Sequence, residues 1–250
     1  MTTIALSGSH SLVSPSITRG GRITPTSDHL SALAQPAKVA VVAAAAAVPP
    51  ITVLHLSATG GVEVTTWTIS DYVVTLPYGT PLFAMTTGAL AVGAIVLARG
   101  LARFAGTRAV TSLLAAWAVS MVLLVTFPTN LRGTPEDLSS NIHLYAGAVA
   151  FAVLPLAGWL LTRWQLRVAG KSVLVTVLGI ASALSGLLST ALILNRFPAV
   201  IGMPELMLPP GILQRAAGGM EIVLLAIAGL VILRSASHSI QHRAQAVEAR

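Results

Sequence analysis

Apolar segments of the length that crosses a bilayer recur along the chain, and short polar segments separate them. A membrane-spanning helix needs about 20 mostly apolar residues, because each residue advances the helix by about 1.5 Å. Six segments meet this requirement, namely residues 38–58, 79–98, 109–127, 142–162, 172–194 and 211–233. The pattern therefore predicts an all-α fold, a polytopic membrane helical bundle with about six transmembrane helices over residues 37–234.

Composition indicates that lipid, and not water, surrounds this bundle. Of the 250 residues, 54% are hydrophobic and 9% are charged, whereas a soluble domain has about 25% charged residues. Because these few charges cannot cover a water-exposed surface, we expect the membrane lipid bilayer to be the main partner. The chain has no cysteine, which excludes disulfides, thiolate nucleophiles and thiolate metal ligands.

The basic residues predict how the bundle is oriented, because short cytoplasmic loops are enriched in Lys and Arg. Of the 15 basic residues, 12 lie on one predicted side: Arg19, Arg22, Lys38, Arg99, Arg103, Arg108, Arg163, Arg167, Lys171, Arg234, Arg243 and Arg250. We therefore predict a multi-pass protein of the cell membrane with both termini cytoplasmic. Residues 1–36 would form a disordered N-terminal tail, and residues 235–250 would form a C-terminal tail. The same clustering accounts for the net charge of +7 without a nucleic-acid partner.

Glu221 is the clearest polar residue inside a predicted span. A charged side chain at the bilayer centre costs about 2.5 kcal/mol or more, and Glu221 lies ~15 Å along the sixth segment. Gln214 stands seven residues earlier on the same face, and Arg215 lies near the outer end on an adjoining face. Two interpretations of Glu221 stay open: a ligand-binding, catalytic or proton-transfer group, or a protonated carboxyl that hydrogen-bonds a neighbouring helix.

Further acid/base candidates lie on the predicted outer side. His143 opens the fourth segment and is able to exchange a proton near neutral pH, or else it bonds a loop carbonyl. His55 lies near the outer end of the first segment, and Asp71 lies in the next loop, where an acidic residue is commonly solvated or caps a helix. We predict catalytic roles for Glu221, Asp71 and His143. We predict substrate contacts from Arg215, Gln214, His55, Asn130, Tyr72 and Trp67.

Three of these predicted contacts have simpler alternatives. Trp67 and Tyr72 are of the type that anchors a membrane protein at the lipid–water interface, and Asn130 resembles an ordinary loop residue.

Several short stretches follow one another in a characteristic order: Thr68-Ile69-Ser70-Asp71-Tyr72, Phe127-Pro128-Thr129-Asn130, His143, and Gly211-Ile212-Leu213-Gln214-Arg215. This order resembles the bacterial family called domain of unknown function 998, whose members are six-helix membrane proteins. The resemblance covers roughly residues 38–233 and implies that Asp71, His143 and Arg215 form one site in the outer leaflet. The family pattern usually has acidic residues where this chain has Asn130 and Gln214, which implies that the site is altered here.

Three functions are consistent with these features, and no H-E-x-x-H, G-x-S-x-G or Walker A motif selects among them. The first is an enzyme that uses acid/base chemistry on a lipid or isoprenoid substrate, as a terpene cyclase, an isomerase or a hydrolase would. The second is a small-molecule or proton-coupled transporter, and the third is a non-catalytic accessory membrane subunit. We favour the enzyme with a hydrophobic small-molecule substrate, and we predict no cofactor and no metal.

Overall fold

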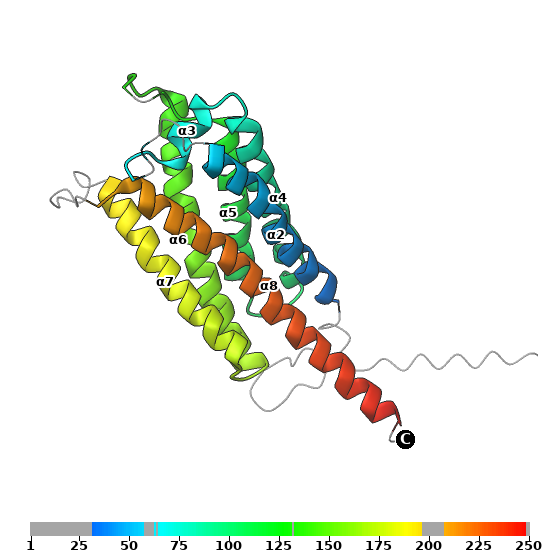
Figure 1. The fold of residues 1–250 in the computed structure, drawn as a ribbon. Coiled ribbons are helices and arrows are strands. Elements are labelled where there is room, and N and C mark those ends of the chain that lie inside the picture. The colour runs from blue at the N-terminus through cyan, green and yellow to red at the C-terminus, as the bar shows by residue number, and fades with distance from the viewer. Residues whose placement is uncertain (1–31, 58–62, 64, 132, 197–207, 249–250) are drawn as a thin grey trace, which may run out of the picture.

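The computed structural model confirms the six-helix membrane bundle (Figure 1). It describes residues 32–57, 63, 65–131, 133–196 and 208–248, and all regular structure in these residues is helical. Six helices are long and apolar enough to cross a membrane. They are α2 (Ala34–Ser57), α4 (Gly79–Leu101), α5 (Arg108–Thr126), α6 (Leu138–Val168), α7 (Val173–Arg196) and α8 (Pro210–Glu248). A short helix, α3 (Ile69–Thr75), covers one end of the bundle.

The helix ends differ from the predicted spans at both ends of the chain. α2 begins at Ala34, inside the predicted tail 1–36, and the first 31 residues of that tail lie outside the described part. α8 continues to Glu248, through most of the predicted C-terminal tail. Hydropathy marks where an apolar run ends, which is not where the helix ends. The chain after Leu233 contains no glycine or proline, so helix formation has no local cause to stop there.

The six long helices form a closed ring in which each helix packs against the next one in the sequence. The order around the ring is α2, α4, α5, α6, α7 and α8, and α8 packs back against α2. Large apolar side chains on the outside of the ring are exposed, among them Val42, Val92, Val122, Trp159, Ile180, Leu187 and Val223. An apolar outer surface of this kind is what lipid tails cover.

The two ends of the ring differ in how their interior is filled. At the end opposite α3, side chains such as Leu97, Leu161, Leu225 and Ile232 fill the centre and are almost completely buried. α6 and α8 also contact each other across the ring. At the α3 end the helices enclose an open space, which the site described below occupies. The basic loops after α4 and α6 lie at the filled end (Figure 1), and the cytoplasmic location of that end stays a prediction.

Gly229 allows the first and last helices of the ring to approach closely. A Cβ atom placed on Gly229 in α8 would lie 2.9 Å from the carbonyl oxygen of Ala37 and 2.8 Å from a Val41 methyl group in α2. Backbone atoms of a packed helix cannot move aside as a flexible side chain can. The glycine is therefore required for the α2–α8 contact that closes the ring.

We expect Gly229→Ala to lower the free energy of unfolding by about 1–3 kcal/mol, because it overpacks this contact. Gly88→Ala is the matched control, since a Cβ on Gly88 in α4 meets no atom within 4 Å. Thermal unfolding of both variants in detergent micelles checks the prediction. Equal stability of the two variants would show that α2 and α8 do not need the glycine.

Candidate functional site

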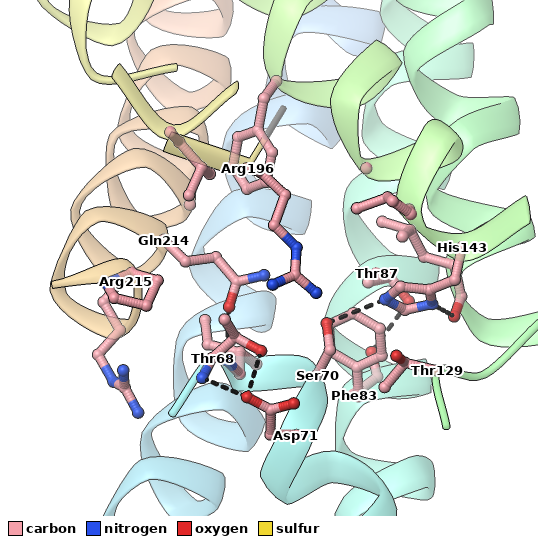
Figure 2. A pocket seen from close by; sticks show the side chains of 18 of the residues that line it. Thr68, Ser70, Asp71, Phe83, Thr87, Thr129, His143, Arg196, Gln214 and Arg215 are labelled. Atoms are coloured by element: carbon pink, nitrogen blue, oxygen red, sulfur yellow. Dashed lines mark hydrogen bonds between the residues drawn. The ribbon is translucent and has the colours of Figure 1, made fainter. Parts of the chain in front are cut away.

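A cavity of about 610 Å³ lies at the α3 end of the ring, and its volume is typical of small-molecule sites. Every helix from α2 to α8 contributes to its lining (Figure 2). Apolar side chains from the spans line part of it, namely Leu90, Met121, Leu124, Phe151 and Ile222. Polar side chains from α3, α6, α7 and α8 line the rest, namely Ser70, Asp71, His143, Arg196, Gln214 and Glu221. The cavity is therefore amphipathic.

His143 and Ser70 form a hydrogen-bonded pair in this cavity. The Ser70 Oγ lies 2.9 Å from the His143 Nε2. The His143 Nδ1 lies 3.0 Å from the carbonyl oxygen of Leu124 and 2.9 Å from that of Phe127. Carbonyl oxygens only accept hydrogen bonds, so Nδ1 carries the proton in the neutral ring and Nε2 accepts the Ser70 hydroxyl proton. The two carbonyls belong to the C-terminal end of α5, where backbone acceptors lack helical partners.

Local capping interactions hold both members of the pair. α6 begins after Asp137, whose Oδ1 accepts from the Ser140 N–H at 2.9 Å, while the Ser140 hydroxyl accepts from the Asp137 N–H at 3.3 Å. This capping box fixes the first turn of α6, and His143 follows in the next turn. α3 begins after Thr68, and the Asp71 Oδ2 accepts from the Thr68 N–H at 2.8 Å and from its hydroxyl at 2.9 Å.

Gln214 ties α3 to α8. Its side-chain oxygen accepts a hydrogen bond from the Ile69 N–H, one residue before Ser70. Since a backbone amide can only donate, this bond assigns the Gln214 oxygen and leaves its NH₂ group facing the cavity (Figure 2). Ser70 is therefore positioned from both sides, by the Thr68–Asp71 cap and by Gln214.

Glu221 lies in the wall of the same cavity, farther along α8. Its side chain is 4% exposed, and its Oε2 accepts a hydrogen bond from the Trp117 indole N–H at 3.3 Å. Its Oε1 has no hydrogen-bond partner among the described residues. Gly218 and Gly219 lie in the turn of α8 just before Glu221, and a Cβ atom added to either glycine would meet no atom within 4 Å. The carboxyl group is thus held at one oxygen, and its other oxygen is buried in the cavity wall without a described partner.

The family comparison covers most of the ring. Residues 41–231 match the family model described as Protein of unknown function (DUF998). The chain belongs to this family. Comparisons with curated proteins and with solved structures gave no significant match. Membership in the DUF998 family therefore agrees with the multi-pass membrane fold, and the geometry of the site has to carry the functional argument.

Seven of the nine site residues that we predicted for this DUF998 protein line the cavity, His143 and six others. These six are Glu221, Asp71, Arg215, Gln214, His55 and Asn130. Trp67 is not among the lining residues, and the Tyr72 side chain lies outside the described part of the chain. The structure thus brings together residues from five separate stretches of the sequence.

Several of the predicted substrate contacts have structural partners. An Arg215 Nη donates to the Trp67 carbonyl oxygen at 2.9 Å, and its guanidinium group points away from His143 (Figure 2). The Asn130 NH₂ group donates to the Pro135 carbonyl oxygen. The His55 Nδ1 donates to the carbonyl oxygen one turn earlier in α2, at 2.7 Å. These three residues hold the cavity wall, and their predicted substrate contacts stay predictions.

Sequence reasoning missed three residues of the site. Ser70 belongs to the stretch Thr68-Ile69-Ser70-Asp71-Tyr72 but was not predicted as a site residue, because a single serine has no sequence signature. Arg196 was not predicted as a site residue, although its guanidinium group points into the cavity (Figure 2). Trp117 was counted only as part of an apolar span.

In the described residues, no group of three or more His, Asp or Glu side chains is arranged to hold a metal ion.

The Asp71 contacts give a test of its predicted catalytic role. If the carboxylate only caps α3, Asp71→Asn should keep most of the activity, because the amide oxygen accepts the same bonds from Thr68. Asp71→Ala should lose the cap and about 0.5–2 kcal/mol of stability. Thermal unfolding and turnover of both variants are the measurements. A loss of turnover in Asp71→Asn, with stability unchanged, would show instead that the carboxyl group takes part in the chemistry.

Proposed function

We propose that this protein is a membrane-embedded enzyme that binds an amphiphilic lipid or isoprenoid in the cavity and acts on it by acid/base chemistry. The observation that carries the proposal is the amphipathic cavity itself, within a ring whose outside faces lipid. A substrate dissolved in the bilayer places its chain against Leu90, Met121 and Phe151. Its polar end then lies near Ser70, His143 and Arg196.

The acid/base groups are His143 and Glu221. His143 has its Nδ1 committed to two backbone carbonyls and its Nε2 directed at Ser70, so Nε2 is the atom that takes up and returns a proton. Glu221 has one oxygen committed to Trp117 and one without a described partner. A carboxyl group in this position exchanges a proton with a substrate deeper in the cavity.

The shape of the ring supports an enzyme over a transporter. An enzyme needs one entrance to its site, and in this structure the end opposite α3 is filled by buried apolar side chains. The Ser235 hydroxyl also donates to the Gln165 side-chain oxygen at 3.2 Å, which links α8 to α6 across that end. A non-catalytic accessory subunit, in turn, does not require an amphipathic cavity of this size.

A cavity-filling substitution tests the proposal. Gly218→Phe places a ring in the open space beside Glu221, and Gly88→Phe places the same ring on the lipid-facing side of α4, where a Cβ also meets nothing within 4 Å. Each variant and the wild type are expressed in a bacterial host, and extracted lipids are compared by mass spectrometry with those of a host carrying an empty vector. Equal expression is checked by immunoblotting.

We expect wild type and Gly88→Phe to change the abundance of the same lipid species. The host that expresses Gly218→Phe should have the same lipid profile as the host that carries the empty vector. If Gly218→Phe changes the lipids as much as wild type does, the cavity is not the substrate site. If wild type itself changes no lipid in a host that makes it at high level, the enzyme proposal is contradicted.

A further inference from the structure

We propose that Ser70 is a nucleophile activated by His143, and that the substrate is an acyl ester of an amphiphilic alcohol. This inference rests on the proposed function, which it narrows to acyl transfer to Ser70 followed by hydrolysis. The observation behind it is the pair formed by the Ser70 Oγ and the His143 Nε2, 2.9 Å apart, in the wall of the cavity.

The pair has the geometry that nucleophilic catalysis by serine requires. A serine hydroxyl is a weak nucleophile until an adjacent base accepts its proton, and that base must be held in the correct tautomer by a third group. In serine hydrolases the third group is commonly a carboxylate. Here the carbonyl oxygens of Leu124 and Phe127 fill that role, since both lie within 3.0 Å of the His143 Nδ1. The C-terminal end of α5, which is the negative end of its helix dipole, faces the His143 imidazole at the same point.

Both members of the pair line the cavity. Ser70 is only partly buried and lines the cavity, although His143 is 8% exposed. Ser182, a buried serine elsewhere in the ring, donates its hydroxyl within its own helix, to the Leu178 carbonyl oxygen at 2.7 Å. Ser70 instead directs its hydroxyl to a histidine 73 residues away in the sequence. A substrate carbonyl carbon can therefore approach the Ser70 oxygen from the open side.

Two N–H donor groups face the region where negative charge develops. The guanidinium group of Arg196 points into the cavity toward Ser70, and the NH₂ group of Gln214 points into the same space (Figure 2). Gln214 is held by its bond from Ile69, so its donors are preorganised. Donors aimed at the oxygen of a tetrahedral intermediate are a large source of rate enhancement in acyl transfer.

The reaction proceeds in two balanced steps. The Ser70 oxygen attacks the ester carbonyl carbon while its proton passes to the His143 Nε2, and the bond from that carbon to the alcohol oxygen then breaks. The departing alcohol takes the proton from His143, which leaves an acyl ester on Ser70. Water attacks this ester, with His143 accepting its proton and returning it to the Ser70 oxygen, and a free carboxylic acid is released. No oxidant, reductant or other co-reactant is needed.

A fluorophosphonate probe tests this inference without knowledge of the natural ester, because it forms a covalent bond with activated serines. The full-length protein is purified in mild detergent and treated with a fluorescent fluorophosphonate. Ser70→Ala removes the proposed nucleophile, and His143→Ala removes its base. Ser139→Ala is the matched control, because Ser139 lies one turn before His143 and its hydroxyl bonds the Pro128 carbonyl oxygen at 2.9 Å. Peptide mass spectrometry of labelled wild type locates the adduct and does not depend on the folding of any variant.

We expect wild type and Ser139→Ala to be labelled at equal rates, with the adduct on Ser70. Ser70→Ala should not be labelled. His143→Ala should be labelled at a rate at least about 10²-fold lower than that of wild type. An adduct on another residue overturns the inference, and so does an unlabelled wild type. If wild type converts a lipid in the host but carries no adduct, the nucleophile is wrong and the proposed function stands. If it neither converts a lipid nor is labelled, both proposals fail.

Discussion

Replacement of His143 by alanine is expected to reduce lipid conversion by about 10²- to 10⁴-fold, the range that general acid–base catalysis contributes. The structural reason is that Nε2 is the proton acceptor facing Ser70. The α5 carbonyls that bond Nδ1 fix this orientation. The measurement is the rate of product formation in lipid extracts of a host that expresses each variant.

Loss of stability is the competing explanation for a His143→Ala defect. Leaving the two α5 carbonyls without their donor costs about 1–3 kcal/mol, so thermal unfolding has to be measured alongside the rate. Val149→Ala, an exposed position on the same helix, is the control for expression and folding. A folded His143→Ala variant with the wild-type rate would contradict the acid/base role.

Glu221→Gln is expected to lower turnover by tenfold or more while the ring stays folded. Glutamine has the shape of glutamate and keeps an oxygen that accepts the Trp117 indole N–H, but an amide cannot exchange a proton as a carboxyl group does. The rate comes from the same lipid extracts, and folding is checked by thermal unfolding. Turnover equal to wild type would leave Glu221 as a packing group paired with Trp117, and chemistry at His143 would be unaffected by that result.

The fold of this chain could be predicted from its sequence because the bilayer imposes one strong requirement. A span must be apolar over a fixed length and must satisfy its own backbone hydrogen bonds, so the six helices follow from hydropathy. The ends of α2 and α8 could not be predicted in the same way, because helix formation continues into polar residues. α3 could not be predicted either, since a helix of this length in a polar loop depends on tertiary contacts such as that between Gln214 and Ile69.

The candidate site could be predicted only where a residue was unusual in its surroundings. Glu221 and Gln214 stood out because polar groups in a span are costly, and both line the cavity. Ser70 could not stand out, because its importance comes from a histidine in another helix. Arg215 stood out by its charge, but its bond to the Trp67 carbonyl oxygen became visible only in three dimensions. The sequence therefore identified the region, and the structure shows which side chains in it contact one another.

The central claim is that the cavity binds a membrane lipid and converts it. The most direct test uses purified wild type and His143→Ala protein in nanodiscs made from the total lipid extract of a bacterial host, with lipids followed by mass spectrometry over time. We predict that at least one lipid species decreases and a product appears with wild type only. Identical lipid profiles for the two proteins throughout the time course would contradict the claim.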